Sequence, residues 1–295
     1  MTRFLDVRLS PVGGPLVASV ATMQGTKIDD YVSLDPAQLV SDVQGRHVLL
    51  VAHGFNVNRA DGIEHLSNWE TLLQLAPPSV FVGLLWPGDS VWAHGLDYPE
   101  EPRIADDAGG QLIAPFVDAH FGGAASISFA SHSLGARVIL QTISKMALPV
   151  RRATLMAGAI DDNCLNGEFQ AAVAKIGELS ALASREDEVL SLAFPLGNFF
   201  AGILDAGHPW WHAALGRTGP ANPPPANFEA PFLIPDDWNF GHGNYLQVIP
   251  APPLPTPPLV PLPANVPPQG TPPAAGGAPG WQQSWSAALV STRFR

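Results

Sequence analysis

The segment Ser131-His132-Ser133-Leu134-Gly135 has the residue types of a nucleophile elbow, a tight turn that joins a strand to a helix and presents a serine. Such a turn needs small residues two positions before and after the serine, and Ser131 and Gly135 meet that need. A serine there becomes a nucleophile when a histidine accepts its proton. Although Ser131 stands where such motifs usually have glycine, we predict that Ser133 is a nucleophile rather than an ordinary helix-capping residue.

The base must follow the serine, because folds that use this elbow place serine, acid and histidine in that order. The histidines after the elbow are His208, His212 and His242. His242 lies between two glycines, which would let a loop present its imidazole to the serine, whereas the other two flank a pair of tryptophans. We therefore predict His242 as the base.

An acid is needed to orient the base, and Asp187 lies just past a predicted strand over 179–183. We predict Asp187 as this acid. Neighbouring carboxylates and those after the preceding strand remain alternatives, namely Glu186, Glu188, Asp161 and Asp162.

An oxyanion site is expected where the first long apolar run ends in His53-Gly54-Phe55. Backbone N–H groups of Phe55 and Leu134 would stabilise the negative charge of a tetrahedral intermediate, and Gly54 would let the chain turn toward the serine. We expect His53 and His132 to have structural roles.

Short apolar runs alternate with segments of helical periodicity along most of the chain, which indicates βαβ units and an α/β fold. We predict a mostly parallel central sheet flanked by helices, preceded by an N-terminal antiparallel hairpin. The predicted strands are 3–9, 16–22, 47–52, 80–86, 125–130, 153–157 and 179–183. The predicted helices are 63–73, 104–121, 134–147 and a stretch around 169–176.

The expected parts of the chain are a catalytic domain (1–249), a cap inserted within it (about 190–230) and a proline-rich C-terminal arm (250–295). Residues 250–279 contain 13 prolines, which favours extended backbone, either as a linker or as an ordered arm. Trp281 and Trp285 favour an arm that packs back on the domain.

The predicted cap is rich in aromatic residues. These residues are Phe194, Phe199, Phe200, Trp210 and Trp211. We predict that they line an apolar substrate pocket; the alternative is that they pack in the core. An apolar pocket favours small to medium apolar esters as substrates.

The charge and the cysteine content of the chain limit the kinds of partner and the location that we expect. The net charge of −11 argues against nucleic acid and against a polybasic membrane attachment. Cys164 is the single cysteine, so no intrachain disulfide forms, which is compatible with a reducing cytoplasm, where we expect the protein. We expect no membrane span, because no apolar run reaches roughly 20 residues. The proposed chemistry needs no metal or organic cofactor.

These segments together resemble a branch of bacterial α/β-hydrolases, many of unknown function. The matching segments are Val51–Asn56, Leu85–Pro87, Ser131–Val138, Ser184–Leu190 and Gly241–Gly243. They match in order over about two thirds of the chain, but not over the proline-rich arm. The resemblance implies the α/β-hydrolase fold and serine hydrolase chemistry, with the acid at Asp187 and the base at His242.

The sequence thus predicts a serine carboxylesterase that works through an acyl-enzyme. Two alternatives stay open. One is a non-catalytic binding protein whose proline-rich segment is a ligand for a protein partner. The other is acyl transfer or amide hydrolysis by the same three residues.

Overall fold

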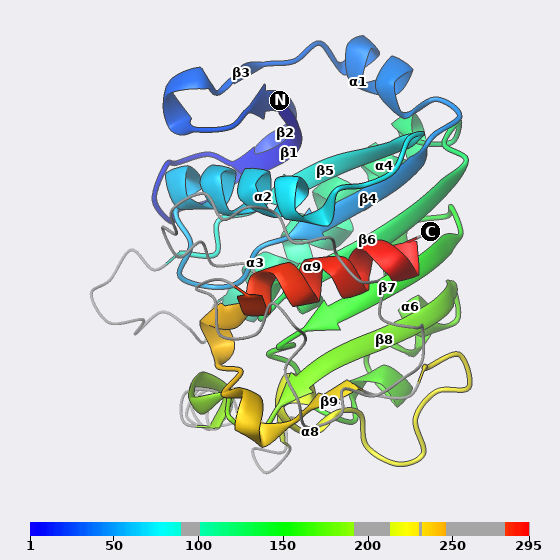
Figure 1. Cartoon of the computed structure of the whole chain (residues 1–295). Coiled ribbons are helices and arrows are strands. Elements are labelled where there is room, and N and C mark those ends of the chain that lie inside the picture. The colour runs from blue at the N-terminus through cyan, green and yellow to red at the C-terminus, as the bar shows by residue number, and fades with distance from the viewer. Residues whose placement is uncertain (90–100, 192–212, 230–231, 246–280, 295) are drawn as a thin grey trace.

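The computed structural model of the chain describes residues 1–89, 101–191, 213–229, 232–245 and 281–294 (Figure 1). These residues fold around one nine-stranded sheet with the strand order β3-β2-β1-β5-β4-β6-β7-β8-β9. The strands are β1 (Thr2–Arg8), β2 (Leu16–Gly25), β3 (Val32–Ser33), β4 (His47–Ala52), β5 (Ser79–Leu85), β6 (Ser126–His132), β7 (Val150–Met156), β8 (Ile176–Ser184) and β9 (Phe232–Ile234).

Most of the sheet is parallel. Every neighbouring pair from β1 through β5, β4, β6, β7 and β8 to β9 runs parallel, whereas β2 is antiparallel to β1 and β3 is antiparallel to β2. The predicted α/β class, the mostly parallel sheet and the N-terminal hairpin are therefore confirmed.

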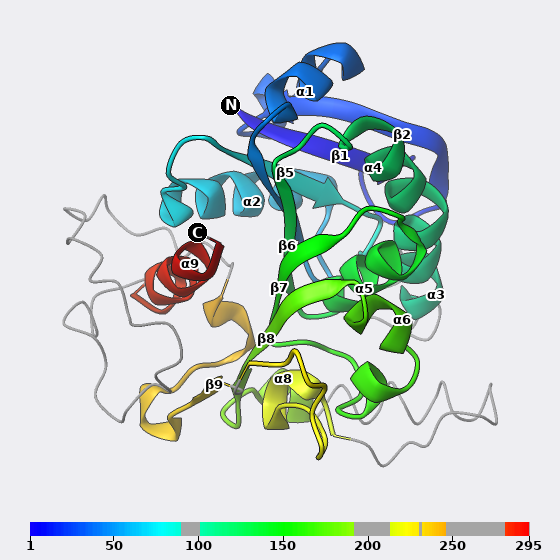
Figure 2. The ribbon, with the colours of Figure 1, turned by 90° about the vertical axis from the view of Figure 1, so that its right-hand side faces the viewer.

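Helices cover both faces of the sheet, as Figure 2 shows: α2 and α9 lie on one face, and α3, α4, α5 and α6 on the other. The helices are α1 (Pro36–Val43), α2 (Arg59–Leu73), α3 (Glu101–Asp107), α4 (Ala114–His120), α5 (Gly135–Lys145), α6 (Gln170–Val173), α8 (Leu215–Thr218) and α9 (Trp281–Phe294). Because both faces are covered, the central strands are apolar on both sides, and Val48 to Ala52 of β4 are at most 1% exposed.

Two helix predictions need correction. The predicted helix 104–121 is helical as far as His120, but a π-helical turn over Ala108–Ile113 joins α3 to α4. The predicted helical stretch around 169–176 is too long, since α6 ends at Val173 and β8 begins at Ile176. The last residue of the predicted helix, Ile176, is instead the first residue of strand β8.

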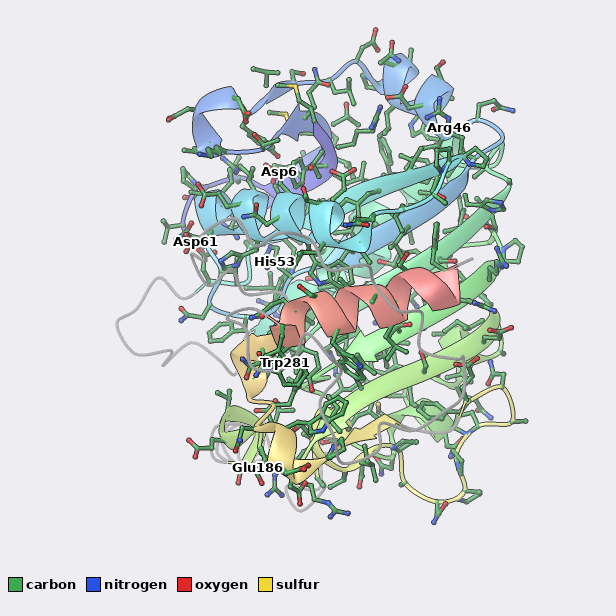
Figure 3. The ribbon with its side chains drawn as sticks, viewed as in Figure 1. Asp6, Arg46, His53, Asp61, Glu186 and Trp281 are labelled. Atoms are coloured by element: carbon green, nitrogen blue, oxygen red, sulfur yellow. The ribbon has the colours of Figure 1, made fainter. Side chains whose placement is uncertain are left out.

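The carboxyl ends of the parallel strands meet at one edge of the sheet. Figure 3 shows His53, which follows β4, and Glu186, which follows β8, toward this edge, whereas Arg46, which precedes β4, lies at the opposite edge. Ser133 and Asp187 also follow parallel strands, so the sheet brings to one edge residues that are far apart in sequence.

Helix α9 packs on the segment that follows β9. Its Trp281 and Trp285 are 8% and 4% exposed and make edge-to-face contacts with Trp238 at ring-centroid distances of 5.5 and 5.4 Å. Phe240 contacts Trp285 at 5.6 Å and Tyr245 at 4.8 Å. The end of the chain thus packs back on the domain, beside the segment that carries His242. Residues 192–212 and 230 of the predicted cap, and residues 250–280 of the predicted arm, lie outside the described residues.

We expect Trp285→Ala to lower the free energy of unfolding by about 3–5 kcal/mol, because it removes a large buried side chain from this aromatic cluster. Urea unfolding followed by circular dichroism measures the change. Gln282→Ala, at a partly exposed position of the same helix, is the matched control and should change stability by less than about 0.5 kcal/mol. Equal stability of both variants would contradict the packing of α9.

Candidate active site

Ser133 occupies the turn between β6 and α5, with a left-handed backbone φ of +53°. A non-glycine residue adopts this conformation only when its surroundings hold it there. Its N–H donates to the Met156 carbonyl at 2.9 Å, and its carbonyl accepts from the N–H groups of Ala136 and Ala159 at 3.1 and 3.2 Å. The strained backbone is therefore fixed by β7, by α5 and by the loop that follows β7.

Gly135 is required by a close approach of two backbone segments. A β-carbon at this position would lie 2.4 Å from the carbonyl oxygen of His53 and 2.8 Å from that of Ala52. These oxygens belong to the end of β4 and cannot rotate aside as a flexible side chain could. Only glycine therefore lets the first turn of α5 lie against the end of β4.

The three residues predicted from sequence lie in one hydrogen-bonded chain. The Nε2 atom of His242 is 2.9 Å from Ser133 Oγ, and its Nδ1 atom is 2.8 Å from Asp187 Oδ2. A carboxylate only accepts, so the proton on the ring belongs on Nδ1 and leaves Nε2 to accept the serine proton. This is the arrangement that lets a histidine act as a general base toward a serine hydroxyl.

The buried position of Asp187 distinguishes it from the rival acids. Asp187 is 0% exposed, and its Oδ1 accepts the Leu190 N–H at 2.9 Å, whereas Glu186 and Glu188 are exposed. Asp161 and Asp162 pair through their backbone with the chain just before α8. Among the described residues, Asp187 alone provides the carboxylate that contacts His242.

A short turn after β9 presents His242. The Gly241 N–H donates to Asn244 Oδ1 at 2.7 Å, and the Asn244 N–H donates back to the Gly241 carbonyl at 3.0 Å. These bonds close the turn and leave the imidazole 16% exposed, so that it reaches the edge of the sheet while its backbone is held.

His132 is next to Ser133 in sequence, but its side chain contacts His242. Its Nε2 donates to the backbone carbonyl of His242 at 2.7 Å, and the two rings lie 4.8 Å apart. Burial, with a contribution from the neighbouring His242, lowers the pKa of His132 to about 3. A neutral His132 adds no positive charge that would oppose protonation of His242.

The loop after β4 lies directly against the elbow. A β-carbon on Gly54 would lie 2.8 Å from Ser133 Cβ and 3.0 Å from His132 Nδ1, so a side chain has no room there. On one side of Phe55, the His53 carbonyl accepts from Trp86 Nε1 at 2.9 Å. On the other side, Asn56 has a left-handed backbone φ of +60°, and its N–H donates to the Gly88 carbonyl at 2.6 Å.

His53 has a structural place in this loop. It is 1% exposed, its Nδ1 lies 2.8 Å from the Gly54 carbonyl, and its ring stacks on Trp86 at 5.7 Å. Burial, followed by the charge of Arg8, lowers the pKa of His53 to about 3. The ring is neutral and contacts the loop rather than Ser133.

The predicted pocket residues lie outside the described part of the chain: Phe194, Phe199, Phe200, Trp210 and Trp211, as do His208 and His212. Leu134, the other predicted oxyanion donor, is 1% exposed at the start of α5.

The sequence interpretation missed Arg8, whose charge acts on His53. Its signal was the pair Asp6 and Arg8, two charges spaced to share one face of a predicted strand.

Within the described ranges, no group of three or more His, Cys, Asp or Glu side chains could hold a metal ion. Cys164 is buried, and burial raises the pKa of its thiol, so it is not poised to react as a thiolate. None of the described helices is long and apolar enough to cross a bilayer.

No protein-family model matches this sequence, and no curated protein matches it. Among solved structures, similar chains include the catalytic core domain of acetyl xylan esterase from Trichoderma reesei (12% identity, 48% of this chain, 65% of that chain, TM-score 0.30). Porphyromonas gingivalis dipeptidyl peptidase 4 is also similar (14% identity, 80% of this chain, 32% of that chain, TM-score 0.36). MenH from S. aureus is similar as well (12% identity, 54% of this chain, 83% of that chain, TM-score 0.28). The chain spans about a third of the peptidase and 65% of the esterase domain, and likenesses this slight carry no argument about activity.

Gly135→Ala tests the close approach of α5 to β4. We expect it to lower the free energy of unfolding by about 1–3 kcal/mol or more, because the added methyl group meets backbone atoms. Thermal unfolding measures the effect. Gly122→Ala is the matched control, since a β-carbon there meets no atom within 4 Å. If both variants unfold at the temperature of the parent chain, the contact is not tight.

Proposed function

We propose that this chain is a serine hydrolase of the α/β-hydrolase type, and specifically a carboxylesterase for small to medium apolar esters. The observation that carries the proposal is the continuous hydrogen-bonded chain from Ser133 through His242 to Asp187. The order of the three residues in the sequence and their place at the carboxyl edge of a parallel sheet support the same assignment.

The reaction starts when Ser133 Oγ attacks the ester carbonyl and His242 Nε2 takes the serine proton. Asp187 keeps the ring oriented and stabilises the imidazolium that forms. The tetrahedral oxyanion accepts hydrogen bonds from the amides of Phe55 and Leu134. His242 then returns its proton to the departing alcohol, which leaves an acyl group on Ser133. Water, deprotonated by His242, attacks the acyl carbon and releases the acid and the free serine.

The preference for apolar esters rests on the aromatic composition of residues 194–211, and the net charge of −11 fits a substrate that is not an anion. The same three residues support amide hydrolysis or acyl transfer to an alcohol, and the assays below separate these outcomes. A cytoplasmic location fits the single buried cysteine.

Turnover of p-nitrophenyl esters from acetate to palmitate tests the proposed reaction. We expect hydrolysis to fall by about 10⁴- to 10⁶-fold in Ser133→Ala, because the covalent step is lost, with circular dichroism unchanged. The chain-length profile measures the depth of the apolar pocket.

Turnover that survives in Ser133→Ala would contradict the proposal. Cleavage of p-nitroanilides alone, or acyl transfer to added alcohol without hydrolysis, would replace the esterase by the corresponding activity, and inertness toward all of these substrates would favour a binding protein.

Asp187→Asn should lower kcat by about 10⁴-fold while leaving KM nearly unchanged, because the amide no longer holds the proton on Nδ1 of His242. Glu186→Gln, which changes an exposed neighbour, is the control and should keep full kcat. If the two variants lose activity equally, or if Asp187→Asn stays active, another carboxylate is the acid.

A further inference from the structure

Arg8, the last residue of β1, is a fully buried cation whose donors are all used. Its side chain is 0% exposed, and a guanidinium has five N–H donors. The structure gives five hydrogen bonds: Nε to the carbonyl of Ser10 (3.4 Å), Nη1 to those of Val57 (3.1 Å) and Trp86 (2.7 Å), and Nη2 to the carbonyl of Pro11 (3.2 Å) and the carboxylate of Asp89. Arginine is the side chain that can satisfy this set, since lysine has three donors on a point charge.

These acceptors belong to three loops at the active-site edge of the sheet. Two lie in the turn after β1, one in the loop after β4, and two in the loop after β5. Arg8 thus joins Val57, two residues beyond Phe55, to Trp86, whose indole holds the His53 carbonyl two residues before Phe55. Arg8 therefore holds the loop that carries the Phe55 amide directly on one side, and through Trp86 on the other.

A second ion pair completes the cluster. Arg59, the first residue of α2, lies 3.1 Å from Asp6 and donates to the Arg8 carbonyl at 2.6 Å. Asp6 accepts the backbone N–H of Arg8 at 2.8 Å and the hydroxyl of Tyr31 at 3.0 Å. Burial raises the pKa of Asp6 and lowers that of Arg8, so both charges are held against a desolvation penalty.

Stability alone does not account for such a cluster, because apolar residues of similar volume often replace buried ion pairs without loss of stability. Apolar residues could not, however, hold the carbonyl groups of three loops in fixed positions. The five hydrogen bonds of Arg8 connect these loops to one another at the active-site edge.

We propose that Arg8 is a positioning residue for catalysis, which holds the loop after β4 through Val57 and Trp86 so that the Phe55 amide faces the oxyanion. The inference rests on the proposed hydrolase function. Arg8 touches neither Ser133 nor the base, so its effect passes through the loop. Displacement of an oxyanion donor weakens binding of the transition state more than binding of the substrate.

The test compares the ester kinetics of Arg8→Lys, Trp86→Phe and Arg3→Met with those of the parent chain. Arg3 is the control, because it lies at the opposite end of β1 and pairs with Asp42 of α1. We expect Arg8→Lys to lower kcat by about 10- to 100-fold with KM within about threefold of the parent value. Affinity for an alkyl boronic acid, which forms a tetrahedral adduct on serine, should fall in parallel with kcat. Arg3→Met should retain kcat, KM and boronate affinity.

Trp86→Phe keeps the inference testable if Arg8→Lys does not fold, because it removes the indole bond to the His53 carbonyl while it keeps an aromatic ring at a 0% exposed position. We expect the same pattern, with a kcat loss of about 3- to 30-fold. A folded Arg8→Lys, or in its absence a folded Trp86→Phe, with unchanged kcat and boronate affinity overturns the inference, as does a loss confined to KM. A parent chain that neither hydrolyses esters nor binds boronate overturns the proposed function, and the inference with it.

Discussion

The site depends on the close approach of two backbone segments, the first turn of α5 and the end of β4. Gly135 allows it, because any β-carbon there would meet the carbonyl oxygens of Ala52 and His53. The contact places the Ser133 turn and the loop after β4 side by side, and Gly54 then lies against Ser133 for the same steric reason. Ser133 and the loop that carries the proposed oxyanion donor Phe55 are adjacent because glycines stand at two positions where the main chains nearly touch.

Two kinds of support hold the rest of the site, and they differ in physical character. The segment that carries His242 packs through aromatic rings on α9, which stabilises it by removing apolar surface from water. The loop after β4 is held by directed hydrogen bonds to Arg8 and Trp86. The predicted base thus rests on packing, and the predicted oxyanion loop on hydrogen bonds to a buried charge.

Local features could be predicted from the sequence, because the strand-to-helix turn at Ser133, the glycine-flanked His242 and the apolar strands each depend on a few neighbouring residues. The choice of Asp187 over its neighbours agrees with its burial, which no local pattern could supply, since the two residues on each side of it are exposed. Its catalytic role remains a prediction, as do those of Ser133 and His242.

What sequence patterns could not predict depends on tertiary contacts. The Arg8 cluster forms from three loops that only the sheet brings together, and the spacing of Asp6 and Arg8 indicates only that two charges share one face of a strand. Helix α9 was expected as a segment that packs back, but its helical form follows from burial against α2 and the Trp238 segment rather than from strong periodicity. Around α6 the spacing of apolar residues predicted a helix that is too long, because Ile176 already belongs to strand β8.

The most direct test of the central claim, that Ser133 is a nucleophile activated by His242, is covalent trapping. The intact chain is incubated with an alkyl fluorophosphonate and analysed by peptide mass spectrometry. The account predicts a single phosphonyl adduct on the peptide that contains Ser133, formed at a rate that falls sharply in His242→Gln. A folded chain that forms no adduct, or forms it on a different serine, would contradict the account.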